Sequence, residues 1–171
     1  TLPGARQAVQ AYGAGDLVLA AVPVYAGRVP NVLRPYLEKN ICGSGALAIP
    51  LVVYGNRNFD DALIELRDLL EEHGLRTVAG AAFIGEHSFS RILAAHRPDE
   101  NDMALAVEFA RKAAEKIAAL QEPPAQPVAV RGETPIRPYY TPRDRQGNPV
   151  NILKVKPKTD NSNCRASSKK P

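Results

Sequence analysis

The sequence predicts an α/β fold: an incomplete, doubly wound parallel sheet of about three strands, followed by an extended C-terminal tail. Three nearly continuous apolar runs, at residues 16–22, 46–53 and 77–84, have the pattern of strands that are buried on both faces. Segments with a helical spacing of apolar residues separate these runs. Strands that alternate with helices in this way form parallel sheets with right-handed crossovers and helices on both faces.

The predicted helices have recognisable ends. Asp60 is expected to cap the middle helix and Gly74 to stop it after about four turns. The last helix is expected from about residue 99 to about residue 120, because Pro123 and Pro124 follow it. The residues expected to face the core are Leu33, Tyr36 and Leu37 in the first helix, Ala62, Leu66, Leu69, Leu70 and His73 in the second, and Met103, Ala106, Ala110, Ala113, Ile117 and Leu120 in the third.

The number of strands is low for a fold of this class. Doubly wound sheets commonly have about five strands, in the order 2-1-3-4-5, whereas residues 1–15 have the pattern of a short helix at most. If the first strand of this chain takes the third place in that order, one of its edges is exposed and apolar. A homodimer through that edge, aggregation, or a shortened chain would each account for it.

Composition limits the class of protein. With 44% hydrophobic and 23% charged residues, the 171-residue chain has the composition of an ordinary globular domain. No stretch approaches the roughly 20 apolar residues of a membrane-spanning helix, and the first residues lack the pattern of a secretory signal. We therefore expect a cytoplasmic protein that does not bind membranes. Cys42 and Cys164 lie far apart, so no disulfide is expected, and Cys42 is interpreted as a structural thiol.

Positive charge is concentrated in the predicted tail. Residues 1–120, the predicted folded domain, carry 12 Lys and Arg against 14 Asp and Glu, a net charge of −2. Residues 121–171 carry 10 against 4, a net charge of +6, together with 9 of the 15 prolines. This composition predicts an extended tail. A solvated or partner-contacting tail is favoured over a nucleic-acid interface, because aromatic residues do not alternate with the charges in a stacking pattern.

Two loops follow the first two predicted strands. Residues 23–30 and 54–60 each combine glycine, an aromatic residue and amide or basic groups. In open parallel sheets, ligands bind outside the carboxyl ends of the strands. The two loops therefore predict a site for a flat, partly polar ligand.

Three loop sequences carry a family resemblance. They read PVYAGRVPN at 23–31, VYGNRNFDDAL at 53–63 and GEHSFS at 85–90, in this order at the ends of predicted strands. Together they resemble the flavodoxin-like half of bacterial proteins that fuse a flavodoxin domain to a ferredoxin domain, over about residues 1–164. The resemblance implies a flavodoxin-like fold, FMN as cofactor, and electron transfer between the flavin and the iron–sulfur clusters of a redox partner.

The tail resembles the connector to the ferredoxin domain and then departs from it. Residues 147–151 and 154–160 are similar to that connector, and Cys164 stands where the first cluster ligand would be. Such clusters need thiolates at C-x2-C-x2-C spacing, but Ser167 and Lys170 occupy the next two positions. No iron–sulfur cluster is therefore expected in this chain.

A second departure concerns the cofactor phosphate. Flavodoxins hold the FMN phosphate in a Ser/Thr-rich turn after the first strand, where backbone N–H groups meet the anion. This chain has no such run. Its nearest glycine-rich element, Gly-Ser-Gly at 43–45, precedes a strand and is interpreted as a turn.

The loops supply the expected cofactor-binding residues. Tyr25 and Tyr54, or Phe59, are expected against the faces of the flavin ring. Backbone groups at Gly27 and Gly55 are expected at its polar edge. The alternative for each tyrosine is to cap the end of the sheet. The complete expected set is Tyr25, Ala26, Gly27, Arg28, Tyr54, Gly55, Asn56, Arg57, Phe59, Asp60 and His87.

Polar members of this set have alternatives of their own. Asn56 is expected to offer amide contacts to the ring. Arg28 and Arg57 are interpreted as surface charges, or as contacts to a phosphate or an acidic partner. His87 follows the third predicted strand and is placed to approach a ligand.

Nothing in the sequence indicates hydrolytic or metal-dependent catalysis, and no catalytic residue is assigned. His73 lies at a predicted helix end, where a cation is favourable, and His96 has no evident partner. No carboxylate or cysteine stands at metal-ligand spacing from a histidine, and no G-x-S-x-G motif occurs. Two functions stay open: a flavodoxin-like electron-transfer protein, and a truncated interaction module without a cofactor.

Overall fold

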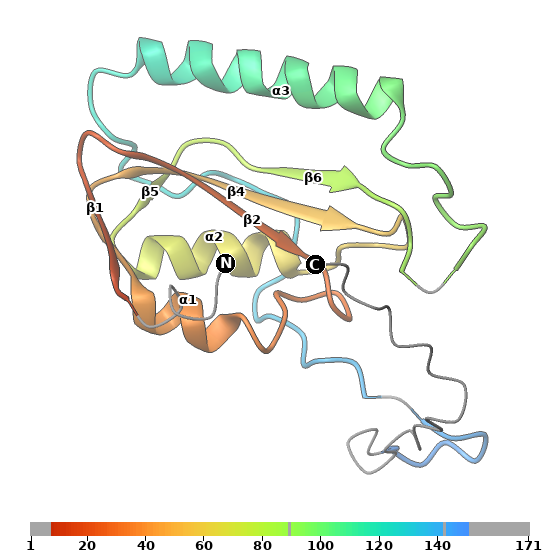
Figure 1. The fold of residues 1–171 in the computed structure, drawn as a ribbon. Coiled ribbons are helices and arrows are strands. Elements are labelled where there is room, and N and C mark those ends of the chain that lie inside the picture. The colour runs from red at the N-terminus through yellow and green to blue at the C-terminus, as the bar shows by residue number, and fades with distance from the viewer. Residues whose placement is uncertain (1–7, 89, 142, 151–171) are drawn as a thin grey trace, which may run out of the picture. The chain divides into compact units, whose positions relative to one another are not determined.

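A parallel sheet forms the centre of the fold in the computed structural model, which describes residues 8–88, 90–141 and 143–150. The central strand pairs on one side with the strand that precedes it in this sheet, and on the other side with two shorter strands. All of these pairs are parallel, and in Figure 1 the arrows of the strands at residues 17–23, 47–54 and 81–84 point the same way. The α/β class is as predicted. The four strands are β2 (Leu17–Pro23), β4 (Leu47–Tyr54), β5 (Arg76–Thr77) and β6 (Ala81–Ile84).

The predicted strand at 77–84 is divided into β5 and β6 because the central strand contains a proline. Val78 donates its N–H to the carbonyl oxygen of Ala48 (3.0 Å), so Ala48 faces this third strand. Pro50, two residues further along β4, faces the same side and has no N–H to donate. Between β5 and β6 the chain has one residue more than the stretch of β4 that lies opposite, and pairing resumes at Ala81.

A second parallel sheet, of two strands, is present beside the main one in the fold, contrary to the prediction. β1 (Gln10–Gly13) pairs with β3 (Ile41–Ser44), so residues 10–13 are a half-exposed strand and not a helix. Gly43 and Ser44 likewise belong to a strand, and Gly45 (φ +81°) makes the turn. The extended conformation of residues 41–44 is held from two sides. The strand pairs with β1, and Gly43 donates its N–H to the carbonyl oxygen of His73 at 2.7 Å.

Helix α1 (Arg34–Asn40) connects β2 to β3 (Ile41–Ser44), and α2 (Ala62–Glu72) connects β4 to β5, whereas α3 (Glu100–Ala119) follows β6. Asp61 is the N-cap of α2, so the predicted cap at Asp60 is one residue early; Asp60 has φ +44° and ends the preceding loop. Asp99 caps α3 through a reciprocal capping box with Asp102.

The end of α2 is a Schellman motif, as the glycine predicted. Gly74 has φ +82° and donates its N–H to Glu71 (3.0 Å), while Leu75 donates to Leu70 (3.1 Å). A Cβ at Gly74 would meet the carbonyl oxygen of Gly43 on β3. Glycine is therefore required here both by the backbone conformation and by the packing of α2 on β3.

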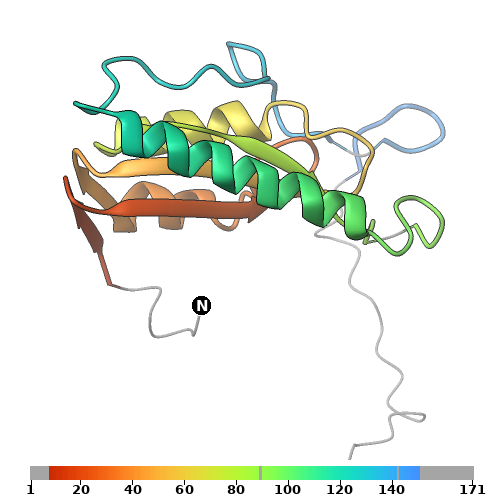
Figure 2. The same ribbon diagram turned by 90° about the horizontal axis from the view of Figure 1, so that it is seen from above.

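The helices cover both faces of the sheet: α1 and α2 lie on one face and α3 on the other (Figures 1 and 2). The larger core lies between the sheet and α2, and the smaller one lies under α3. Met103 was expected in the core but is 54% exposed, because the inward stripe of α3 runs instead through Asp102, Phe109, Ala113 and Ile117. None of the described helices is long and apolar enough to span a membrane.

The compact unit extends beyond the predicted domain end at residue 120, to Tyr139. Residues 121–139, here called the return segment, contain no helix or strand but bond to α2 and β5. Arg67 on α2 donates to the carbonyl oxygen of Val128, and Val128 donates to Thr77 Oγ1, both at 3.1 Å. A second unit begins at Tyr140, and in its described part Asp144 organises a turn through residue 148.

Replacing Gly74 by alanine is expected to destabilise the protein by more than about 1 kcal/mol, because a left-handed conformation and a backbone contact oppose the new Cβ. The urea midpoint of unfolding measures this loss. Gly15→Ala is the control: nothing lies within 4 Å of a Cβ there. Equal midpoints for the two variants would contradict this account of the helix end.

Candidate functional site

Three loops gather at the carboxyl edge of the main sheet. They follow β2, β4 and β6, which are adjacent parallel strands. Two hydrogen bonds continue the sheet into the loops: Val24 donates to Val53 (3.0 Å) and Gly85 donates to Tyr54 (2.9 Å). The strand-end location predicted for the site is therefore formed by neighbouring elements, and the loop after β6 joins the two loops that were predicted first.

The first loop folds into a tight turn. Tyr25 and Arg28 exchange backbone hydrogen bonds of 3.0 and 3.1 Å. Ala26 (φ +51°) and Gly27 (φ +77°) occupy the turn, and two consecutive positive φ values characterise a type I′ turn. The turn presents Tyr25, which is 55% exposed, at the edge of the sheet.

The second loop packs directly against the first. A Cβ at Gly27 would collide with the side chain of Asp60, and Asp61 donates its N–H to the carbonyl oxygen of Gly27 (3.0 Å). Asn56 has φ +57° and is exposed. Arg57, also exposed, donates to the carboxylate of Asp60 at 3.1 Å. The predicted residues of the two loops are thus held together by backbone contacts.

The aromatic residues of the site differ in burial. Tyr54 and Phe59 meet edge to face, with ring centroids 5.2 Å apart. Phe59 is 9% exposed and has the guanidinium of Arg131 over its ring at 5.2 Å. Phe59 therefore lies beneath Tyr54 as part of the core, and Tyr25 and Tyr54 are the aromatic residues nearer to solvent.

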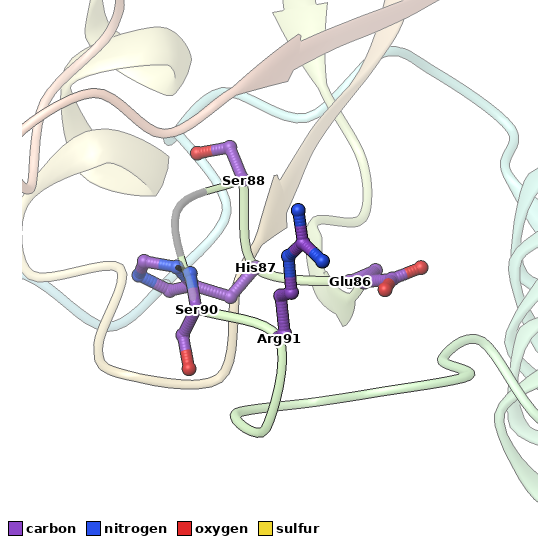
Figure 3. A pocket seen from close by; sticks show the side chains of 5 residues that line it. All are labelled: Glu86, His87, Ser88, Ser90 and Arg91. Carbon is purple, nitrogen blue, oxygen red and sulfur yellow. Dashed lines mark hydrogen bonds between the residues drawn. The ribbon is translucent and has the colours of Figure 1, made fainter.

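The third loop closes against the second. A Cβ at Gly55 would lie 2.8 Å from Cδ2 of His87, so this loop packs on bare backbone. Ser90 donates its N–H to His87 Nδ1 at 3.0 Å, which makes Nδ1 the acceptor. Residues of the third loop line an open cavity of about 550 Å³ (Figure 3), within the size range of ligand sites. Its lining residues are Glu86, His87, Ser88, Ser90 and Arg91.

Arg28 is buried and is not a surface charge. Its Nε and Nη2 atoms donate to the two carboxylate oxygens of Glu65, both at 2.7 Å, and Val29 donates its N–H to the same carboxylate at 2.9 Å. The ring of Tyr139 lies 4.5 Å from the guanidinium. The hydrogen bonds that Arg28 donates to Glu65 raise the pKa of Arg28. The guanidinium thus fixes the turn to α2.

Asp61 makes the equivalent attachment for the return segment. Its fully buried carboxylate accepts bonds of 2.9–3.0 Å from the backbone N–H, Nε and Nη2 of Arg137, and one of 3.1 Å from the N–H of Glu133. Hydrogen bonding by Arg137 holds the pKa of Asp61 well below its usual range. Arg28 also donates to the carbonyl oxygen of Arg137, which joins the two attachments into one network.

Sequence reasoning missed the two acidic residues of this network. Asp61 and Glu65 stand four residues apart, so they lie on one face of α2. Their neighbours Ala62 and Leu66 are apolar and fully buried. The sequence did contain a signal for these buried carboxylates, because both stand beside apolar residues of α2 near its start. Arg137, the cation that binds Asp61, lies in the predicted basic tail.

The remaining chemical candidates lie apart from this site. His73 meets the backbone oxygens of Leu69 and Glu38 at 2.7 Å, which fits a structural role. Cys42 is exposed, whereas a structural thiol was expected. No group of three or more potential metal ligands occurs within residues 8–88, 90–141 and 143–150. Cys164 lies outside the described residues, as does the predicted connector from residue 151 onward.

Comparisons with protein-family models, with curated proteins and with solved structures gave no match to this chain.

Replacing Asp61 by asparagine preserves the size of a side chain that makes no capping bond to α2 but removes the charge that binds Arg137. We expect a loss of about 2 kcal/mol of unfolding free energy, since a buried, charge-assisted set of bonds is weakened. Glu108→Gln, in an exposed pair with Lys112, should change stability by less than about 0.5 kcal/mol.

The pH dependence of the wild type follows from the same carboxylate. A pKa that folding lowers adds stability above the unfolded pKa of about 3.9. This stability is lost as the pH falls through the folded pKa. Unfolding at stepped acidic pH should therefore show a smaller acid loss for Asp61→Asn than for the wild type. Parallel profiles would contradict the assigned role of Asp61.

Proposed function

We propose that this chain binds FMN at the three strand-end loops and acts as a flavodoxin-like electron-transfer protein, exchanging electrons with an iron–sulfur partner protein. In this role the flavin carries the electrons, and the protein supplies orientation and electrostatics. The observation that carries the proposal is the meeting of the loops after β2, β4 and β6, where Tyr25 is exposed and Tyr54 is half-buried.

Backbone strain in these loops supports a ligand site. Ala26, Asn56 and Asp60 have φ values of +51°, +57° and +44°, which are uncommon for residues with side chains. Such residues concentrate at functional sites, where the surrounding structure holds them. The positive φ values turn the loops tightly, and a flat ring could then approach their backbone N–H and C=O groups.

The proposed roles of the side chains follow their burial. Tyr25 and Tyr54 contact the ring faces, and Phe59 supports Tyr54 from below. Asn56 and the backbone at Gly27 and Gly55 meet the polar edge of the ring. Asp60, Arg57 and His87 border the site, whereas Arg28 acts indirectly, by fixing the Tyr25–Arg28 turn to α2.

The sequence has no phosphate-binding turn, so affinity rests on the ring contacts and is expected to be low. The direct test is the visible absorbance of the purified protein after incubation with FMN and removal of excess flavin by gel filtration. Because weakly bound flavin can be lost on the column, flavin fluorescence is also titrated at equilibrium, and its quenching by the protein is the expected result. A colourless protein that also fails to quench flavin fluorescence at equilibrium would overturn the proposal.

Replacing Tyr54 by alanine should weaken FMN binding by some tens of fold, because it removes an aromatic contact and uncovers Phe59. Titration of flavin fluorescence measures the change. Leu105→Ala, at a 61% exposed position on α3, is the control and should bind like the wild type. Unchanged affinity in Tyr54→Ala would remove this residue from the site.

The second candidate function, an interaction module without cofactor, is favoured by a different observation. β2 has an apolar edge, and among the described strands it pairs with β4 alone. Such an edge is a template for another chain whether or not flavin is bound.

A further inference from the structure

Within the part of the chain that the structure describes, β2 is an edge strand that pairs with β4 alone. Its sequence, LVLAAVP, contains no charged residue, and its only proline is the last residue. Leu17 and Leu19 are 47% and 63% exposed, and Ala21 is also exposed. Soluble proteins normally blunt such edges with charges, bulges or internal prolines. An edge without these devices is suited to pairing with another strand.

Hydrogen bonding identifies the backbone groups at this edge. Leu47 donates to the carbonyl oxygen of Asp16 (3.0 Å), and Val24 donates to that of Val53 (3.0 Å). Even-numbered residues of β2 therefore direct their backbone groups toward β4. The backbone groups of Leu17, Leu19 and Ala21 point the opposite way, to the open edge.

The side chains of these three residues lie on the face of the sheet that α3 covers. α3 crosses β6 and β4 and leaves β2 largely uncovered (Figure 2). The contact of Lys116 Nζ with the carbonyl oxygen of Val78 fixes one flank of α3 on the β5–β6 side. By helical spacing, Met103 and Val107 lie on the opposite flank, toward β2, and are 54% and 67% exposed. The open strand thus borders further apolar surface.

We propose that β2 pairs with β2 of a second copy of this chain, antiparallel about a twofold axis, so that the two main sheets form one continuous sheet. A second copy fits because the stretch has no charge, so two copies meet without repulsion. Exposed leucines of the two strands then pack side by side on one face, which stabilises antiparallel pairs.

The register of the pair follows from Pro23. The backbone nitrogen of Pro23 faces the open edge, but proline has no N–H to donate to a partner strand. A partner strand therefore cannot continue its hydrogen bonding past Pro23. The freely pairing stretch is therefore Leu17 to Ala21, whose midpoint is Leu19. Twofold symmetry places Leu19 opposite Leu19 and Leu17 opposite Ala21, with complete hydrogen-bond exchange in each pair.

The first test is the molar mass of the flavin-free protein, measured by light scattering or sedimentation over a wide concentration range. Because the pairing is of one strand, we expect a concentration-dependent dimer. Leu19→Lys should abolish it, since lysine blocks strand edges. Leu105→Lys, on the exposed surface of α3, should dimerise like the wild type. A wild type that stays monomeric, or equal loss in both variants, would overturn the proposal.

The second test fixes the register. Leu19→Cys is made in a chain whose own Cys42 and Cys164 are serines. Directly opposite hydrogen-bonded residues have Cα atoms about 5.5 Å apart, within disulfide range. Oxidation should therefore give a covalent dimer with Leu19→Cys, but not with Val53→Cys, which is 43% exposed on the neighbouring strand. Equal cross-linking of both would contradict this interface. Neither test uses flavin, so its outcome is independent of the proposed FMN site.

Discussion

Two buried carboxylates at the start of α2 organise the part of the molecule that bears the candidate site. Glu65 neutralises Arg28 and also binds the backbone of Val29, while Asp61 receives Arg137. A buried charge without a partner is costly, so each carboxylate fixes the position of its cation. Because Asp61 and Glu65 are one helical turn apart, the loop after β2 and the return segment meet on one face of α2.

The same arrangement explains how irregular backbone is kept in place at the edge of the sheet. The turn at Ala26 and Gly27 has little apolar packing of its own, but Arg28 and Val29 attach it to Glu65. The loop after β4 is attached by the bond from Asp61 to the carbonyl oxygen of Gly27. Strained positions persist when neighbouring contacts over-determine them, and these ion pairs provide such contacts.

Sequence reasoning succeeded where local patterns decide the structure. Continuous apolar runs gave β2 and β4, and Gly74 marked the end of α2 because its backbone conformation favours glycine. The neighbouring placement of the loops after β2 and β4 was also predicted, since the carboxyl ends of adjacent parallel strands share an edge. The predictions that failed depended on contacts distant in the sequence. β1 is a strand because it pairs with β3. Part of the predicted tail is folded because Arg137 binds Asp61, which lies 76 residues earlier in the sequence.

The attachment of Tyr139 bears on how this protein would meet a tethered partner. Its hydroxyl donates to the carbonyl oxygen of Val29 at 2.6 Å, next to the turn that presents Tyr25. The compact unit ends at this residue, so the chain leaves it beside a loop of the candidate site. A tether sets an effective concentration that depends on the span it must cross. The span from the end of this unit at Tyr139 to the turn that presents Tyr25 is therefore short.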